Sequence, residues 1–174
     1  EDQVARQEGA VALSVDVDRV TGDLLHRLEL ADRVVVLRDG RIEQVGTPRE
    51  IYDAPASAYV FDFIGRASVI EGMVAAGRFS PHGQAFGFDA AGVADGPAGM
   101  YLRPHDAQTG AAGEGLEAWV CAVHPHAGRI TLELALAGQE RALEVDLVAT
   151  PGTQVPALGA VTGLQLPRYR VYPR

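Results

Sequence analysis

The residues of this sequence best suited to contact an anion are Arg103 and His105, in the stretch "RPHDA". Arginine presents a planar fork of N–H donors that matches the oxygens of an oxyanion. These two residues are therefore the best candidates in the sequence for an oxyanion-binding or regulatory contact. The alternative is a strand end whose arginine pairs with a nearby carboxylate. The basic stretch 168–170, near the end of the sequence, has the same two interpretations.

A metal site is the second chemistry that the residue types suggest. His124 and His126 flank Pro125, and Cys121 lies three residues before the first histidine. Zinc takes four protein ligands in structural sites and three in catalytic ones. The alternative is a hairpin loop that carries exposed histidines. We prefer this alternative and predict no metal site.

No residue pattern predicts catalysis. Asp16 and Asp18 alternate along an expected strand, which is typical of a solvated strand face. The serines lack the Gly-x-Ser-x-Gly pattern that exposes a nucleophile at a sharp turn. All 15 basic residues are arginine, so the chain cannot supply the lysine with which a phosphate-binding P-loop reaches the β- and γ-phosphates.

Composition narrows the class of protein further. Hydrophobic residues make up 47% of the 174 residues and charged residues 22%, a balance that allows a buried core. The net charge of −8 and the absence of a basic cluster argue against nucleic-acid binding, which needs a basic face. A single cysteine excludes an internal disulfide framework and is expected in a reducing compartment.

The elements that must position these residues change in character near residues 65–68. Before this point, alternating and β-branched runs predict strands, and apolar residues at helical spacing predict helices. Asp39-Gly40 is a hairpin-turn signal, and Thr47 with Glu50 is a capping box that begins a helix. The expected strands are 10–18, 33–37 and 41–46, and the expected helices are 23–31, 48–52 and 57–64.

After this point, short strands separated by glycine and proline clusters predict a small β-barrel or sandwich. We expect Trp119, Phe86 and Phe88 to lie in its core, and residues 108–115 to form a loop. The expected strands are 69–75, 85–88, 100–103, 119–123, 129–136, 142–147 and 161–166. The predicted fold class is therefore α+β, with domains at 1–65 and 66–174.

The stretch "LELADRVVVLRDGRIEQVGTPREIYDAPASAYVFDFIG" closely resembles the end of the ATP-binding subunit of ABC importers. The resemblance covers about Val20 to Gly65. Later stretches, "MYLRPHDA", "VCAVHPHAGRITLELAL" and "GLQLPRYRVYP", resemble the C-terminal accessory domain of the sulfate/thiosulfate branch. That domain is a barrel of the oligonucleotide/oligosaccharide-binding type. The resemblance implies the remnant of a nucleotide-binding domain at 1–65 and a mostly β accessory barrel at 66–174.

The same resemblance implies that ATP and Mg²⁺ act upstream of this sequence, so we expect no cofactor in this chain. The Gly-rich loop with its lysine, "LSGGQ" and "LLLDEP" do not occur here. In the family a histidine contacts the γ-phosphate at the switch position, where this chain has Gly22. Glycine has no side chain to donate a hydrogen bond, and His26 lies one helical turn away. We therefore predict no catalytic residue and no ATP hydrolysis by this chain alone.

The resemblance also implies partners and a place in the cell. The expected partners are the permease transmembrane subunits and a second copy, bound through nucleotide-binding or accessory domains, with an oxyanion ligand left open. The expected location is cytoplasmic, peripheral on the inner face of the plasma membrane. The alternative function is a free-standing barrel that binds or senses molybdate or sulfate. A third interpretation, prompted by a first residue that is Glu1 rather than methionine, is a truncated gene product or a fragment.

Overall fold

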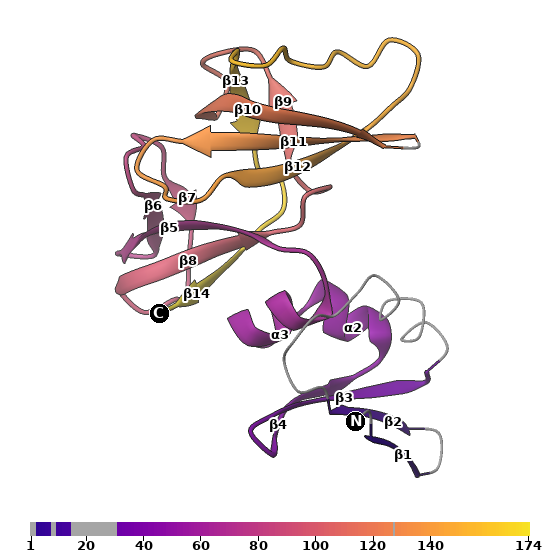
Figure 1. Ribbon diagram of the computed structural model, residues 1–174. Helices are drawn as coiled ribbons and strands as arrows, with labels where there is room; N and C mark the ends of the chain where they lie inside the picture. Colours follow the sequence, from indigo (N-terminus) through magenta and orange to yellow (C-terminus); the bar gives the residue numbers. More distant parts are fainter. Residues whose placement is uncertain (1–2, 8–9, 15–30, 127) are drawn as a thin grey trace. The chain divides into compact units, whose positions relative to one another are not determined.

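A computed structural model of the protein describes residues 3–7, 10–14, 31–126 and 128–174 (Figure 1). The chain divides into two compact units, Glu1–Arg66 and Ala67–Arg174. Most of the regular structure is β, and the described residues contain two short helices. None of the described helices is long and apolar enough to cross a membrane.

The N-terminal unit contains a four-stranded sheet in the order β1-β2-β3-β4. β2 and β3 pair in parallel, and the two outer pairs are antiparallel. The connection between β2 and β3 lies outside the described residues, as do Asp16, Asp18, Gly22 and most of the helix expected at 23–31. β1 was not predicted because its polar residues show no strand period. The strands are β1 (Gln3–Gln7), β2 (Ala10–Ser14), β3 (Arg33–Arg38) and β4 (Arg41–Gly46).

The hairpin and the capping box in this unit are confirmed. Asp39 and Gly40 both have positive φ, 51° and 75°, as a two-residue hairpin turn requires. The Thr47 hydroxyl accepts from the Glu50 amide at 3.2 Å, and the Glu50 carboxylate accepts from the Thr47 amide at 2.8 Å. These bonds begin α2 (Pro48–Asp53), and Ser57 caps α3 (Ala58–Ile64).

A small apolar core supports the N-terminal unit. It forms where alternate residues of β3 meet one face of each helix, because strand and helix periods bring those side chains to one side. Its buried members are Val34, Val36, Ile51, Val60, Phe63 and Ile64.

The C-terminal unit consists of two five-stranded antiparallel sheets, in the orders β14-β8-β5-β6-β7 and β12-β11-β10-β13-β9. The first sheet contains β5 (Ser68–Ala75), β6 (Arg78–Pro81), β7 (Phe88–Asp89), β8 (Gly96–Leu102) and β14 (Arg170–Pro173). The second contains β9 (Gln108–Gly110), β10 (Leu116–His126), β11 (Arg129–Leu136), β12 (Leu143–Val148) and β13 (Val161–Gln165).

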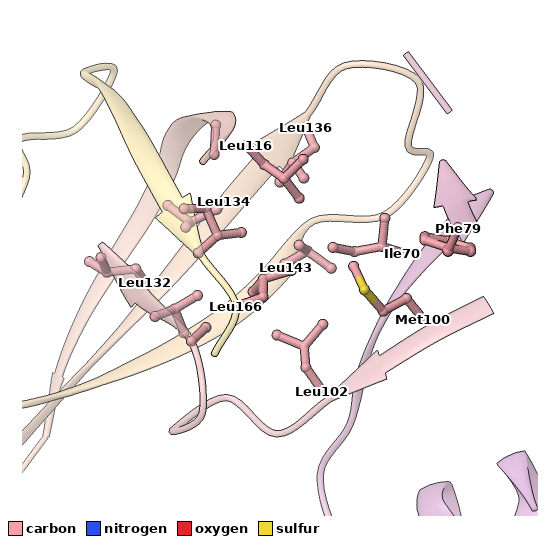
Figure 2. Close-up of a cluster of buried hydrophobic side chains, with 14 of the residues drawn as sticks. Ile70, Phe79, Met100, Leu102, Leu116, Leu132, Leu134, Leu136, Leu143 and Leu166 are labelled. Carbon is pink, nitrogen blue, oxygen red and sulfur yellow. The ribbon is translucent and has the colours of Figure 1, made fainter. Parts of the chain in front are cut away.

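The inner faces of the two sheets share one hydrophobic core, which makes the unit barrel-like. Figure 2 shows Ile70 and Met100 from the first sheet close to Leu143 from the second, within a core that also contains Phe79 and Leu132. All five side chains are at most 1% exposed. Burying a side chain of this size stabilises the fold by about 1.5–3 kcal/mol, so this core is the main source of stability in the unit.

Polar side chains join the two sheets at two points. The Ser68 hydroxyl bonds the backbone of Glu144, accepting from its amide at 3.0 Å and donating to its carbonyl. The side chain of Gln139 accepts from the Glu71 amide at 2.7 Å and donates to the carbonyls of Glu71 and His82. Each side chain thus bonds backbone groups of the opposite segment and ties the two sheets together at that point.

At the Gln139 junction two turns approach each other backbone to backbone. Gly138 has φ +76°, and a Cβ atom there would collide with the carbonyl oxygen of His82. Gly83 has φ +73°, and its Cβ would lie 2.5 Å from the carbonyl oxygen of Ala137. Glycine is therefore required at both positions by the space as well as by the backbone conformation.

A β-bulge at Cys121 divides β10 into two halves that face differently. Val120 pairs with Leu134 and Ala122 with Glu133, so Cys121 is one extra residue. Before the bulge, Glu117 and Trp119 are exposed on the outer face. After it the even-numbered residues take this face, and His124 lies opposite Thr131.

Several predicted boundaries of the C-terminal unit are wrong. Part of the expected loop forms β9, and the expected strand at 85–88 is reduced to β7, which begins at Phe88. β6 and β14 were not predicted. His124–His126, expected in a loop, continue β10. Backbone pairing with neighbouring strands decides these short segments, and that pairing is not visible in local residue patterns.

Candidate functional site

The Arg103–Asp106 turn follows directly after β8 and connects it to the second sheet. The Asp106 amide donates to the Arg103 carbonyl at 2.9 Å, which closes the turn. The Pro104 carbonyl accepts from the Asp146 amide of β12 at 2.8 Å. One backbone hydrogen bond therefore closes the turn on itself, and a second fixes the turn to β12.

The two residues predicted to contact an anion are placed differently in this turn. Arg103 is only 3% exposed, whereas the His105 side chain is exposed and lies 3.9 Å from the Asp106 carboxylate. A solute oxyanion could reach His105 directly but not the buried guanidinium. The closed geometry favours a structural role for Arg103, and anion binding at this pair stays a prediction.

Aromatic side chains of β8 and β14 lie close to Arg103. The rings of Tyr101 and Tyr172 pack edge to face with centroids 5.4 Å apart. Burial raises the pKa of the Tyr172 phenol above its usual value, and the positive charges of Arg170 and Arg103 oppose this shift. The positive charge of Arg103 therefore acts on the partly buried phenol of Tyr172.

A buried carboxylate next to the turn was missed by the sequence analysis. The Asp146 side chain is buried on β12, accepts from the Thr131 hydroxyl at 2.7 Å and lies 3.4 Å from the Arg129 guanidinium. Buried charges need such partners because desolvation is costly. The only sequence signal was an aspartate within the apolar run "LEVDLV".

The outer face of the second sheet carries the exposed residues of β10. Trp119 was expected in the core, but it is 36% exposed. It belongs to the set of outward residues that alternates with buried Leu116, Ala118 and Val120. Phe86 is also exposed rather than buried, while Phe88 packs partly against the core as expected.

One histidine on this face, His124, forms a pair with a carboxylate. His124 Nε2 lies 2.9 Å from Glu133 Oε1 on β11. Among the residues that the structure describes, no group of three or more His, Cys, Asp or Glu side chains converges to hold a metal ion. Gly22, the proposed switch position for nucleotide, lies outside the described residues.

Comparison with curated proteins identifies relatives of this chain. The sulfate/thiosulfate import ATP-binding protein CysA of Burkholderia mallei is 42% identical over 131 residues, which are 74% of this chain and 37% of that protein. CysA 1 of Rhizobium meliloti is 44% identical over 129 residues, 74% of this chain and 37% of its own length. CysA of Xanthomonas campestris is 38% identical over 134 residues, 77% of this chain and 38% of its own length.

The chain is homologous to the C-terminal portion of sulfate/thiosulfate import ATP-binding proteins. It spans a little over a third of the length of these curated relatives. No protein-family model matches it. The predicted resemblance to this group of ABC importer subunits is confirmed.

Proposed function

We propose that this chain is the C-terminal portion of the ATP-binding subunit of an ABC importer for sulfate or thiosulfate, with structural and regulatory roles. The observation that carries the proposal is the identity of about 40% to CysA proteins over three quarters of the chain. The N-terminal unit would then be the end of a nucleotide-binding domain, and the C-terminal unit its accessory barrel.

The remaining assignments follow from this proposal. ATP and Mg²⁺ would act in the preceding part of such a subunit, since this chain has no P-loop motif and no lysine. Permease subunits and a second ATP-binding subunit would be its partners, at the inner face of the plasma membrane. The absent motifs and Gly22 support a chain that does not hydrolyse ATP by itself.

A chimera with a relative tests the proposed place in a transporter. Residues 33–174 would replace the matching region of the Burkholderia mallei protein, in a strain without its own importer ATPase. We expect sulfate uptake to be restored, whereas the relative truncated at the junction should give none. A chimera that assembles in the membrane but transports no sulfate would contradict the proposal.

A second chimera tests the switch position. If residues 20–174 are transplanted instead, Gly22 replaces the side chain that contacts nucleotide, and we expect uptake to fall to the background of the truncated control. Gly22→His in this chimera should restore transport. Full activity with Gly22 in place would show that the switch assignment is wrong.

Direct assays on the purified chain separate the proposal from its alternatives. We expect neither ATP hydrolysis nor nucleotide binding at micromolar concentrations, and either result would overturn the non-catalytic assignment. Calorimetry with sulfate, molybdate and tungstate should show no tight binding. Tight binding would instead favour a free-standing oxyanion-binding barrel.

A further inference from the structure

We propose that the outer face of β10, β11 and β13 is a docking surface for a protein segment that carries apolar side chains together with arginine or lysine. The Trp119 face, as we call it, consists of Glu117, Trp119, Glu133, Ala135 and Val161. The inference goes beyond the proposed function and does not depend on it, because it rests on the exposure and charge of these side chains.

The centre of the Trp119 face is apolar and exposed. Trp119 and Val161 are direct cross-strand partners, 36% and 41% exposed, and Ala135 is the partner of Trp119 on its other side. Leu158, 69% exposed, precedes Gly159, whose amide bonds the carbonyl of Val120. Large apolar side chains gathered on a surface mark interaction sites, and tryptophan is enriched at the centre of interfaces.

The rim of the Trp119 face is acidic. Glu117 lies two residues before Trp119 on the same face, and Glu133 lies directly opposite Glu144 on the neighbouring strand. His124 pairs with Glu133, while Arg129 pairs with buried Asp146. The carboxylates of Glu117 and Glu133 flank the apolar centre and would complement cations supplied by a partner.

The same charges argue against a second copy as the occupant. Apposing two Trp119 faces would bring the glutamates of one copy close to those of the other, in a chain whose net charge is −8. Like-charge juxtaposition across an interface disfavours that partner strongly. A basic segment instead brings complementary charge, which speeds association and selects the partner.

The sequence provides two reporters at the site. Trp119 is the chain's one tryptophan and Cys121 its one cysteine, and Cys121 is exposed on the same strand. The probe is a synthetic peptide in which leucine alternates with arginine, compared with a peptide that has glutamate in place of every arginine. We expect the basic peptide to shift Trp119 emission to shorter wavelength, and the acidic peptide to leave it unchanged.

Matched variants separate docking on this face from attraction to an acidic protein. Glu117→Gln with Glu133→Gln should weaken binding of the basic peptide about tenfold and flatten its salt dependence. Glu140→Gln with Asp62→Asn removes the same charge from two exposed residues outside the face, and should change affinity less than twofold. Trp119→Thr, with a fluorophore on Cys121 as reporter, should abolish binding.

Three outcomes would overturn the proposal. The first is equal weakening by the two double variants, which would show nonspecific attraction. The second is peptide binding without any change at Trp119. The third is a shift of Trp119 emission on raising the protein concentration alone, with dimers in sedimentation equilibrium, which would show that a second copy covers the face.

Discussion

At the scale of single residues, two side chains that are close in the sequence need not belong to the same site. Arg103 and His105 are two positions apart, yet one side chain is buried and the other exposed. The tight turn at Pro104 separates them, because its backbone is fixed to Asp146 and its side chains point to different environments. The pair therefore does not form one open anion site in the described geometry.

This separation predicts different effects of two substitutions on stability. Arg103→Ala removes a buried side chain with a long apolar stem, so we expect a loss of about 2–3 kcal/mol in the free energy of unfolding. His105→Ala, on the exposed side of the turn, should change it by less than about 0.5 kcal/mol. Urea unfolding of both variants, followed by Trp119 fluorescence, makes the comparison. Equally small effects of the two substitutions would show that the fold does not need Arg103, and would favour the interpretation that Arg103 binds an anion.

At the scale of elements, the capping box of α2 should make stability depend on pH. Hydrogen bonds from the backbone and side chain of Thr47 hold the pKa of Glu50 below its usual value of 4.5. The stabilisation is therefore fully present above pH 4.5 and is lost as pH falls through the lower pKa of the folded state. In Glu50→Gln this part of the acid dependence should disappear, whereas Asp62→Asn, outside the box, should retain it. Urea titrations at several acidic pH values, followed by circular dichroism, test this difference.

The turn that contains Gly138 offers a second test at this scale. Gly138 and Gly92 have similar positive φ, but a Cβ at Gly92 would meet nothing within 4 Å. Gly92→Ala should lose about 1–2 kcal/mol from backbone strain alone. Gly138→Ala should lose roughly 1–3 kcal/mol more, because two turns must move apart. Equal thermal stabilities of the two variants would mean that the junction between the sheets is not tightly packed.

The elements that sequence reasoning predicted correctly are those with a strong local cause. The Asp39-Gly40 hairpin, the Thr47 capping box and β11 each have turn chemistry, capping chemistry or a long apolar alternation. The exposure of Trp119 could not be predicted, because a strand's alternation does not say which of its faces is covered. β14 and β9 could not be predicted either, since each is short and is defined by distant partner strands.

At the scale of the whole molecule, the two units have separate hydrophobic cores. A unit with its own core should fold alone, so a fragment of residues 67–174 should unfold cooperatively and keep native Trp119 emission. A fragment that begins at Gly72 lacks Ser68 and Glu71, which join the two sheets, and should unfold at much lower urea concentration. A long fragment without a cooperative transition would show that the C-terminal unit depends on the preceding residues.

The extra residue in β10 has a consequence for comparing homologous genes. Losing one codon at Cys121 would remove the bulge and make Val120 and Ala122 neighbours, still paired with Leu134 and Glu133. Val123 would stay opposite Leu132 and His124 opposite Thr131, so every residue after the bulge would keep its face. A one-residue gap at any regular position of this strand would instead move the following residues to the other face, because side chains alternate between the two faces. Relatives that lack one residue at the bulge can therefore be compared position by position on both sides of it.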